Sequence, residues 1–171
     1  AEKLFRQGKR YRYGEDGTQV NDEKAREYFT EAAELDHAEA QYELYQSLCE
    51  FGEEDEGIGW LENSANLGFG PAQYEYAKGF EFELPENEYD ERIARAFSWY
   101  EERALAGDVE RQFEFATIHL NGDVNVANRA QGLHWLKASA AQDYRPACRR
   151  LGNEYLSAKA TDQTTEQGIY W

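Results

Sequence analysis

The sequence predicts an all-α repeat protein, a solenoid of about five repeats that each contain two helices. The first observation is a small residue followed three positions later by an aromatic residue, a motif that begins at Ala25, Gly57, Ala96 and Gly132. Its spacings are therefore 32, 39 and 36 residues. A second, independent motif has the same three spacings, at residues 40–42, 72–74, 111–113 and 147–149. Two motifs with shared spacings indicate that the repeat extends along the whole chain.

Each repeat is expected to contain a first helix, a loop, a second helix and a tight turn. The expected repeats are residues 1–37, 38–69, 70–107, 108–143 and 144–171, the last truncated, and together they form a single domain. In the turns between repeats, Gly68 and Gly107 suit the left-handed conformation that follows a helix. The expected N-caps of the second helices are Asn21 or Asp22, Asp55, Asp90 and Thr164.

The second helices should supply most of the core. An Ala lies five residues after each aromatic, at Ala33, Ala65, Ala104 and Ala140. Small residues let neighbouring helices approach closely, and an aromatic ring fills the space between them. Tyr28, Trp60, Trp99 and Trp135 are therefore expected to be core residues. Replacing any one of them by Ala should cost about 3–5 kcal/mol.

The charge of the chain restricts its partners. The net charge of −16 argues against nucleic acid and against an anionic membrane surface. A basic protein partner is compatible with this charge, and so is a role in solubility alone. Acidic residues are concentrated in residues 38–69, where eight Asp or Glu residues occur and no Lys or Arg. No apolar run approaches the ~20 residues of a membrane span, and no signal peptide is visible.

No catalytic, cofactor-binding or metal-binding residue is predicted, and we expect no enzyme activity. His37, His119 and His134 share no register, and none lies at metal-ligand spacing from another His or Cys, so turn or surface positions are expected. The many carboxylates leave a glycosidase-type pair open, although no pair stands out. Cys49 and Cys148 fall in the second and fifth repeats, and a stacked array would separate them beyond the ~7 Å limit for a disulfide.

The repeats resemble the Sel1-like repeat family, which is related to tetratricopeptide repeats. The resemblance rests on residues 13–25, 28–33 and 40–44, and on Leu151-Gly152-Asn153-Glu154-Tyr155, which matches the family's Leu-Gly-x-x-Tyr element. It covers essentially the whole chain, but the Leu-Gly pair is replaced at residues 44–45, 76–77 and 115–116. The resemblance implies a right-handed superhelix of antiparallel helix pairs that scaffolds protein–protein contacts. Such proteins are often found in bacterial envelopes, secretion or host interaction.

The same resemblance implies that the first helices line a concave, ligand-binding face. The residues expected to contact a partner there are Phe5, Lys9, Arg12, Tyr42, Gln46, Tyr74, Lys78, Glu81, Phe113, Thr117, Arg149 and Asn153. Cys49, Leu120 and Leu156 are expected to face the same way. Aromatic side chains beside polar ones are typical of binding hot spots. The alternative is that the aromatic residues pack between neighbouring repeats as core.

The leading expectation is a non-enzymatic adaptor that binds another protein in this groove. The alternative is an inhibitor, such as an immunity protein that neutralises a bacterial toxin, since an acidic chain associates rapidly with a basic target. A cell-wall or lactam hydrolase is a third class, suggested by family analogy alone. Family analogy also favours the bacterial periplasm or envelope over the cytoplasm. The last second helix stops at Trp171, so we expect the natural chain to continue or this end to be covered, for instance by end-to-end self-association.

Overall fold

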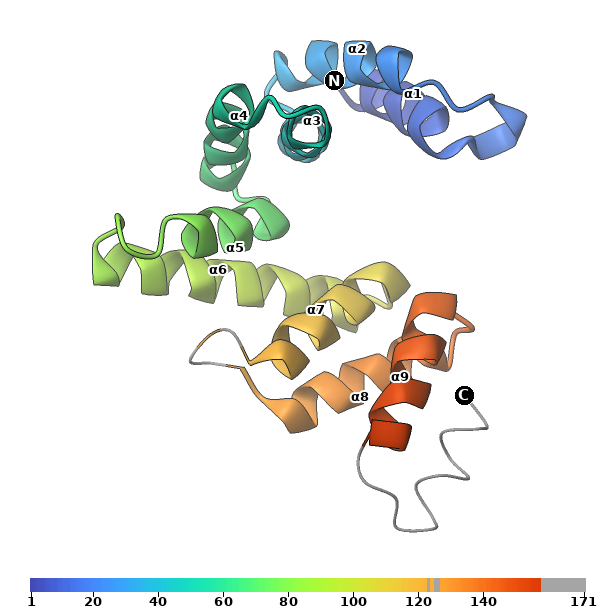
Figure 1. Ribbon diagram of the computed structural model, residues 1–171, viewed down its shortest axis with the longest axis vertical. Helices are drawn as coiled ribbons and strands as arrows, with labels where there is room; N and C mark the ends of the chain where they lie inside the picture. Colours follow the sequence, from blue (N-terminus) through green and yellow to red (C-terminus); the bar gives the residue numbers. More distant parts are fainter. Residues whose placement is uncertain (123, 125–126, 158–171) are drawn as a thin grey trace. The chain divides into compact units, whose positions relative to one another are not determined.

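The computed structural model describes residues 1–122, 124 and 127–157, and every regular element in these residues is helical (Figure 1). The helices are α1 (Glu2–Tyr13), a short 3₁₀ helix η1 (Glu15–Gly17), α2 (Asp22–Ala33), α3 (Ala38–Glu50), α4 (Glu54–Asn66), α5 (Gly70–Gly79), α6 (Glu86–Leu105), α7 (Val109–Asn121), α8 (Arg129–Ala140) and α9 (Arg145–Ser157). The odd-numbered helices are the first helices of the predicted repeats, and the even-numbered ones are the second helices. The predicted all-α fold class is therefore confirmed.

The chain forms two compact units, each described here by itself. The N-terminal unit is Ala1–Ala96, and the C-terminal unit begins at Phe97 within α6. In the N-terminal unit, α2 packs against both α1 and α3, and α4 packs against both α3 and α5. In the C-terminal unit, α8 packs against α7 and α9. The expectation of one continuous domain over residues 1–171 stays a prediction.

The N-cap predictions have a mixed outcome. The side chain of Asn21 accepts a hydrogen bond from the Lys24 N–H at 2.9 Å, as predicted for the start of α2. Asp55 and Asp90 are not caps, because α4 begins at Glu54 and α6 begins at Glu86. The start of α6 directly follows Pro85, whose fixed φ favours the first turn of a helix. Thr164 lies outside the described residues.

The core position of the second helices lies one residue after the position that the motif predicted. Phe29, Leu61, Tyr100 and Leu136 are at most 4% exposed. The predicted core residues Tyr28, Trp60, Trp99 and Trp135 are only half-buried. Trp60 and Trp135 pack against the core clusters, but from the edge, so the prediction placed the centre of the core one residue too early. Adjacent residues of an α-helix point about 100° apart, since one turn takes 3.6 residues, and a shift of one residue moves a ring from core to edge. The predicted alanines are confirmed as core, each at most 1% exposed.

The half-buried aromatic residues make contacts that suit an edge position. The Tyr28 ring stacks on Tyr11 at 5.7 Å between centroids. The guanidinium groups of Arg103 and Arg111 make cation–π contacts with the Trp99 ring, at 5.1 and 5.6 Å from its centroid. Such rings cover apolar surface on one side and face charged groups on the other.

Small residues of one helix face large residues of its partner. A Cβ atom added at Gly8 in α1 would lie 2.5 Å from ring atoms of Phe29 in α2. In the next repeat, the equivalent first-helix position holds Tyr45, and a Cβ at Gly57 would lie 3.2 Å from that ring. In each pair, a glycine on one helix thus faces an aromatic ring on the other, and the helix that carries the ring differs between the two pairs. This complementarity keeps the packing dense.

Buried polar side chains connect the helices at repeated positions. Gln41 donates through Nε2 to the carbonyl of Ala33 at 3.1 Å, and Gln112 donates to the carbonyl of Ala104 at 2.9 Å. These carbonyls lie in the last turn of a second helix, where the intrahelical partner is missing. Within repeats, Ser64 and Ser139 donate to the carbonyls of Ala38 and Val109 at 2.6 and 2.7 Å.

The side-chain oxygens of the two buried glutamines differ in their hydrogen bonding. Gln112 Oε1 accepts a hydrogen bond from Gln142 at 2.8 Å, whereas the buried Gln41 Oε1 has no partner among the described residues. The register position equivalent to Gln142 is Leu67, which is 49% exposed. We expect Leu67→Gln to supply the missing donor and to raise the free energy of unfolding by about 1 kcal/mol.

Denaturant unfolding of wild type and Leu67→Gln measures this difference directly. Leu67→Ser, whose hydroxyl is too short to reach, is the control and should give no gain. A gain of the same size in both variants would mean that the removal of exposed leucine, and not the new hydrogen bond, stabilises the protein.

His119 corrects the expectation that all three histidines lie in turns or at the surface. His119 is 3% exposed, and its ring lies against Phe115 and Phe97, with centroids 4.5 and 5.1 Å away. Its Nδ1 accepts a hydrogen bond from the Asn128 N–H at 3.0 Å, while the buried Nε2 has no partner among the described residues. Burial lowers the pKa of His119, and the nearby Glu101 only partly opposes this.

Acid should therefore destabilise the C-terminal unit through His119. Because the pKa of His119 is lowered in the folded state, the unfolded chain binds the proton first, and stability falls as the pH drops below the unfolded value of about 6.5. The check is thermal unfolding of wild type and His119→Asn at neutral and mildly acidic pH. The variant keeps an acceptor but cannot titrate, so it should lose less stability on acidification. Parallel losses in both proteins would contradict this role.

Candidate protein-interaction surface

Tyrosine and glutamate side chains connect the successive first helices of the N-terminal unit. The Tyr13 hydroxyl, at the end of α1, donates to the Glu43 carboxylate of α3, at 3.2 Å from both oxygens. The hydroxyls of Tyr42 and Tyr45 in α3 donate to the two oxygens of Glu75 in α5, at 2.6 and 2.9 Å. We call these five residues the Tyr–Glu surface. Each carboxylate is therefore held by tyrosine from the preceding first helix.

Packing of the rings positions the hydroxyl groups of α3. The Tyr42 ring lies 5.4 Å from the ring of Phe69, which directly precedes α5 and is 7% exposed. It also lies 6.1 Å from the ring of Tyr45, and both tyrosines are half-buried. Tyrosine has few rotatable bonds, so rings held in this way present their polar ends with little further loss of entropy on binding.

The electrostatics of the Tyr–Glu surface favour a cationic ligand. Burial raises the pKa of Glu43, while the hydrogen bond from Tyr13 and the nearby charges of Lys9 and Arg12 oppose the rise. Burial also raises the pKa of Tyr45, and the adjacent Glu75 adds to the rise, so this hydroxyl stays a donor over the physiological range. Carboxylates in a partly desolvated setting attract a cation more strongly than fully hydrated ones do.

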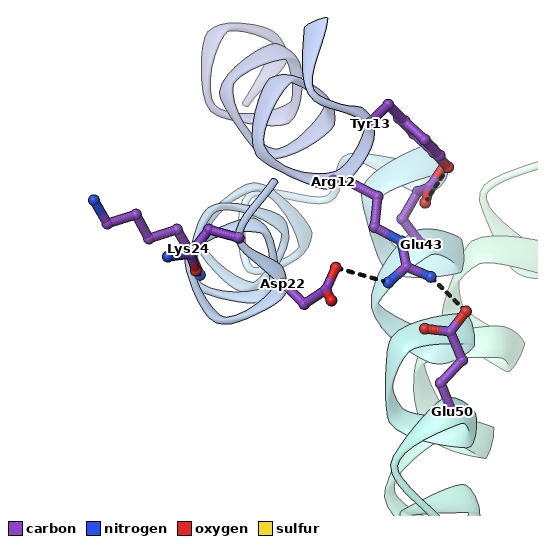
Figure 2. Close-up of polar contacts among 7 residues, drawn as sticks. Arg12, Tyr13, Asp22, Lys24, Glu43 and Glu50 are labelled. Carbon is purple, nitrogen blue, oxygen red and sulfur yellow. Dashed lines mark hydrogen bonds and ion pairs between the residues drawn. The ribbon is translucent and has the colours of Figure 1, made fainter. Parts of the chain in front are cut away.

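Arg12, a predicted contact residue, instead connects three helices of the N-terminal unit. Figure 2 shows its guanidinium between Asp22, at the start of α2, and Glu50, at the end of α3. The distance from Arg12 Nη1 to Asp22 Oδ1 is 3.2 Å, and the Arg12 side chain is 20% exposed. The neighbouring Tyr13 points to Glu43 in the same view. Arg12 therefore fixes the end of α1 next to the Tyr–Glu surface.

The other predicted contact residues of the N-terminal unit have different environments. Phe5 is 5% exposed and stacks on His37 at 4.5 Å, so it belongs to the core. The Lys9 ammonium lies over the rings of Phe5 and Tyr13, 5.7 and 6.0 Å from their centroids. Gln46, Tyr74 and Lys78 are half-buried, Glu81 is exposed, and Lys78 and Glu81 form an ion pair at 3.0 Å.

In the C-terminal unit, Phe113 packs on the core of α7, α8 and α9, with its ring 5.6 Å from that of Tyr144. Thr117 donates to the carbonyl of Phe113 within its own helix at 2.9 Å. Arg149 and Asn153 are exposed on α9. Of the aromatic row expected along the first helices, Phe5 and Phe113 therefore serve packing, as the core alternative proposed.

Sequence reasoning missed Tyr13, Glu43, Tyr45 and Glu75. A signal existed, because Glu43, Glu75 and Glu114 occupy one register position, directly after the predicted aromatic row. Glu114 has a different partner, the Arg111 guanidinium at 2.7 Å, and burial raises its pKa. A glutamate that recurs at one register position next to half-buried rings indicates a carboxylate with a hydrogen-bond or ion-pair partner. Which residue is the partner depends on how the helices pack.

The described residues contain no group of three or more His, Cys, Asp or Glu side chains that could hold a metal ion. Cys49 and Cys148 are free thiols. Among the helices that the structure describes, none has both the length and the apolar character needed to cross a membrane.

Solved structures of other proteins share this fold. A Sel1 repeat protein from Oxalobacter formigenes is 23% identical with a TM-score of 0.58, and the match covers 98% of this chain and 67% of that one. A protective antigen of uropathogenic Escherichia coli with an SLR fold is 24% identical (TM-score 0.52; 91% and 33% covered). An immunity protein from Pseudomonas aeruginosa is 15% identical (TM-score 0.51; 99% and 66% covered). The present chain thus spans about two thirds, one third and two thirds of these proteins, respectively.

A search of curated proteins finds no match. The family model of the Sel1 repeat matches residues 4–37, 70–108 and 112–144, which together make up more than half of the chain. The family model leaves the repeats 38–69 and 144–171 unmatched, apart from residue 144. Residues 38–69 still form the helix pair α3–α4, in which Leu61 and Ala65 are buried. The chain belongs to the Sel1 repeat family.

Proposed function

We propose that this chain is a non-catalytic protein-interaction module whose partner contacts the Tyr–Glu surface of the N-terminal unit. The observation that carries the proposal is the pair of carboxylates, Glu43 and Glu75, each held by tyrosine hydroxyls of the preceding first helix. Tyrosine is enriched at binding hot spots because it combines apolar area with a polar end. Sel1 repeats act in general as scaffolds for protein contacts, which supports a role of this kind.

The partner surface should be basic. The repeat that contributes α3 contains no Lys or Arg, and the chain as a whole carries a net charge of −16. A lysine or arginine that reaches Glu43 or Glu75 would form a charge-assisted hydrogen bond in a partly desolvated place. Long-range attraction would also raise the association rate, and added salt would reduce it.

A second candidate function is inhibition of a basic bacterial toxin. The fold is shared with an immunity protein from Pseudomonas aeruginosa, and strong acidity suits rapid capture of a basic target. This function would use the same surface, but with one tight partner instead of several weaker ones. An adaptor and an inhibitor therefore differ in stoichiometry and affinity.

Affinity capture from a bacterial lysate with matched charge variants tests the proposal. The test variant is Glu43→Gln/Glu75→Gln, and the control is Glu27→Gln/Glu31→Gln, which removes two exposed carboxylates of α2. Both variants change the net charge equally. We expect the test variant to retain about a tenth or less of the partner at equal protein concentration, and the control to retain nearly all of it. Equal capture by both variants would contradict the assignment of the surface.

The same capture at low and high salt separates the two candidate functions. One stoichiometric partner that high salt releases would support the inhibitor. Several partners held in substoichiometric amounts would support the adaptor. Circular dichroism of both variants shows whether each keeps its helical content.

A further inference from the structure

The connection between α5 and α6 is a closed loop with an aromatic residue at its tip. The Glu83 and Leu84 N–H groups both donate to the Phe80 carbonyl, at 3.0 and 2.9 Å. The ring of Phe80 lies 4.7 Å from that of Tyr76 in α5, and the Arg92 guanidinium of α6 covers Tyr76 at 4.8 Å. The loop is thus tied to both helices.

Phe82 lies between Phe80 and Glu83, whose backbone groups close the loop, and its side chain is 95% exposed. It is the most exposed large apolar residue among those that the structure describes, followed by Leu105 at 72%. A second exposed phenylalanine of the same unit, Phe51, is 56% exposed and lies against the Arg26 guanidinium at 5.1 Å. Because hydrogen bonds on both sides of Phe82 fix the backbone of the loop, binding at this ring costs little further loss of backbone entropy.

The surroundings of Phe82 are acidic. Glu81 and Glu83 flank it, and Glu86 and Glu88 follow in the first turn of α6. Two of these four carboxylates are paired, Glu81 with Lys78 at 3.0 Å and Glu88 with Arg92 at 3.0 Å. Glu83 and Glu86 are exposed on either side of Leu84 and Pro85. A ligand for the tip must therefore offer apolar area to the ring and positive charge around it.

We infer that the Phe82 loop is a second docking site, which takes the apolar face of a basic amphipathic helix of another protein. A helix with a leucine stripe bordered by lysine or arginine would cover the ring and place its charges near Glu83 and Glu86. The carboxylates argue against an anionic membrane, which attracts basic and not acidic segments. They also argue against a second copy of this chain, whose net charge is −16.

A defined probe tests this site without the natural partner. The probe is a fluorescent amphipathic helical peptide of leucine and lysine, and its reference is a peptide of the same composition in scrambled order with no continuous apolar face. Both peptides carry the same charge, so the ratio of their affinities isolates the apolar contact. The proteins are wild type, Phe82→Ser and the control Phe51→Ser, and fluorescence anisotropy reports binding.

We expect wild type and Phe51→Ser to bind the amphipathic peptide about tenfold more tightly than the scrambled one, and Phe82→Ser to lose this preference. A preference that is absent in wild type, or that survives in Phe82→Ser, would overturn the inference. Two other results would also overturn it, because each would show that Phe82 contacts something other than a basic helix. They are Phe82-dependent binding to neutral phosphatidylcholine vesicles and Phe82-dependent dimers in sedimentation velocity. The Glu43→Gln/Glu75→Gln variant should keep the peptide preference, so a failure of this inference is distinct from a failure of the Tyr–Glu surface.

Discussion

Replacing Phe29 by Ala should lower the free energy of unfolding of the N-terminal unit by about 3–5 kcal/mol. Phe29 is 1% exposed and lies in the cluster that α1, α2 and α3 form with Phe5, Leu44 and Leu48. The truncation removes the ring and leaves a cavity between helices that cannot close on each other completely. An effect of this size is a large fraction of the stability of a small domain.

The matched substitution is Tyr28→Ala, one residue earlier in the same helix. Tyr28 is half-buried, stacks on Tyr11 and leaves no closed cavity when removed, so its truncation should cost less than half as much. Denaturant unfolding of the two variants gives the comparison. If Tyr28→Ala were the more damaging change, the repeated aromatic residues would be the core after all, and the observed burial would be misleading about energetics.

Gly8→Ala should destabilise the N-terminal unit by about 1–3 kcal/mol, although alanine is the better helix former by roughly 1 kcal/mol. The added Cβ would lie 2.5 Å from Cδ1 and Cε1 of Phe29, closer than a carbon contact allows. The ring cannot swing away freely, because Phe29 is enclosed by its own cluster. Overpacking therefore outweighs the gain in helix propensity.

Gly59→Ala is the control, since Gly59 lies in α4 of the same unit and a Cβ there would meet nothing within 4 Å. This substitution should raise the free energy of unfolding by about 0.5–1 kcal/mol through helix propensity alone. Chemical denaturation of both variants shows whether each substitution raises or lowers the free energy of unfolding. Stabilisation by Gly8→Ala would show that α1 can move away from α2 at little cost.

Repeat spacing could be predicted from the sequence because it needs only the recurrence of residue types. The small residues at Ala25, Gly57, Ala96 and Gly132 are all buried, and so are the alanines eight residues later. The core ring was misplaced by one residue because Trp and Tyr are the most conspicuous side chains, whereas burial falls on the following Phe, Leu or Tyr. A periodicity does not say which of two adjacent apolar residues faces the partner helix.

The Tyr–Glu surface was harder to predict, since its hydrogen bonds join helices from different repeats. The expected row along the first helices contained Tyr42, which is half-buried, and also Phe5, which is core. Which side of a first helix faces its neighbour depends on the rotation of that helix, and so on close packing at residues such as Gly8 and Tyr45. The ion pairs of Arg12 with Asp22 and Glu50 likewise depend on three helix ends that meet, and sequence spacing does not show this.

The predicted contact residues of the C-terminal unit, together with export and end-to-end self-association, stay predictions. The expected groove would involve Arg149 and Asn153 of α9 in addition to the N-terminal residues. Capture with Arg149→Ala/Asn153→Ala beside the Tyr–Glu variant would show whether α9 contributes.

The most direct test of the proposed function is a titration of the purified, captured partner with wild type, Glu43→Gln/Glu75→Gln and Glu27→Gln/Glu31→Gln by calorimetry. We expect Glu43→Gln/Glu75→Gln to bind at least about tenfold more weakly than wild type, and its affinity to depend less on salt. The α2 control should match wild type at high salt. If all three proteins bound the partner equally at both salt concentrations, the Tyr–Glu surface would not be the binding site.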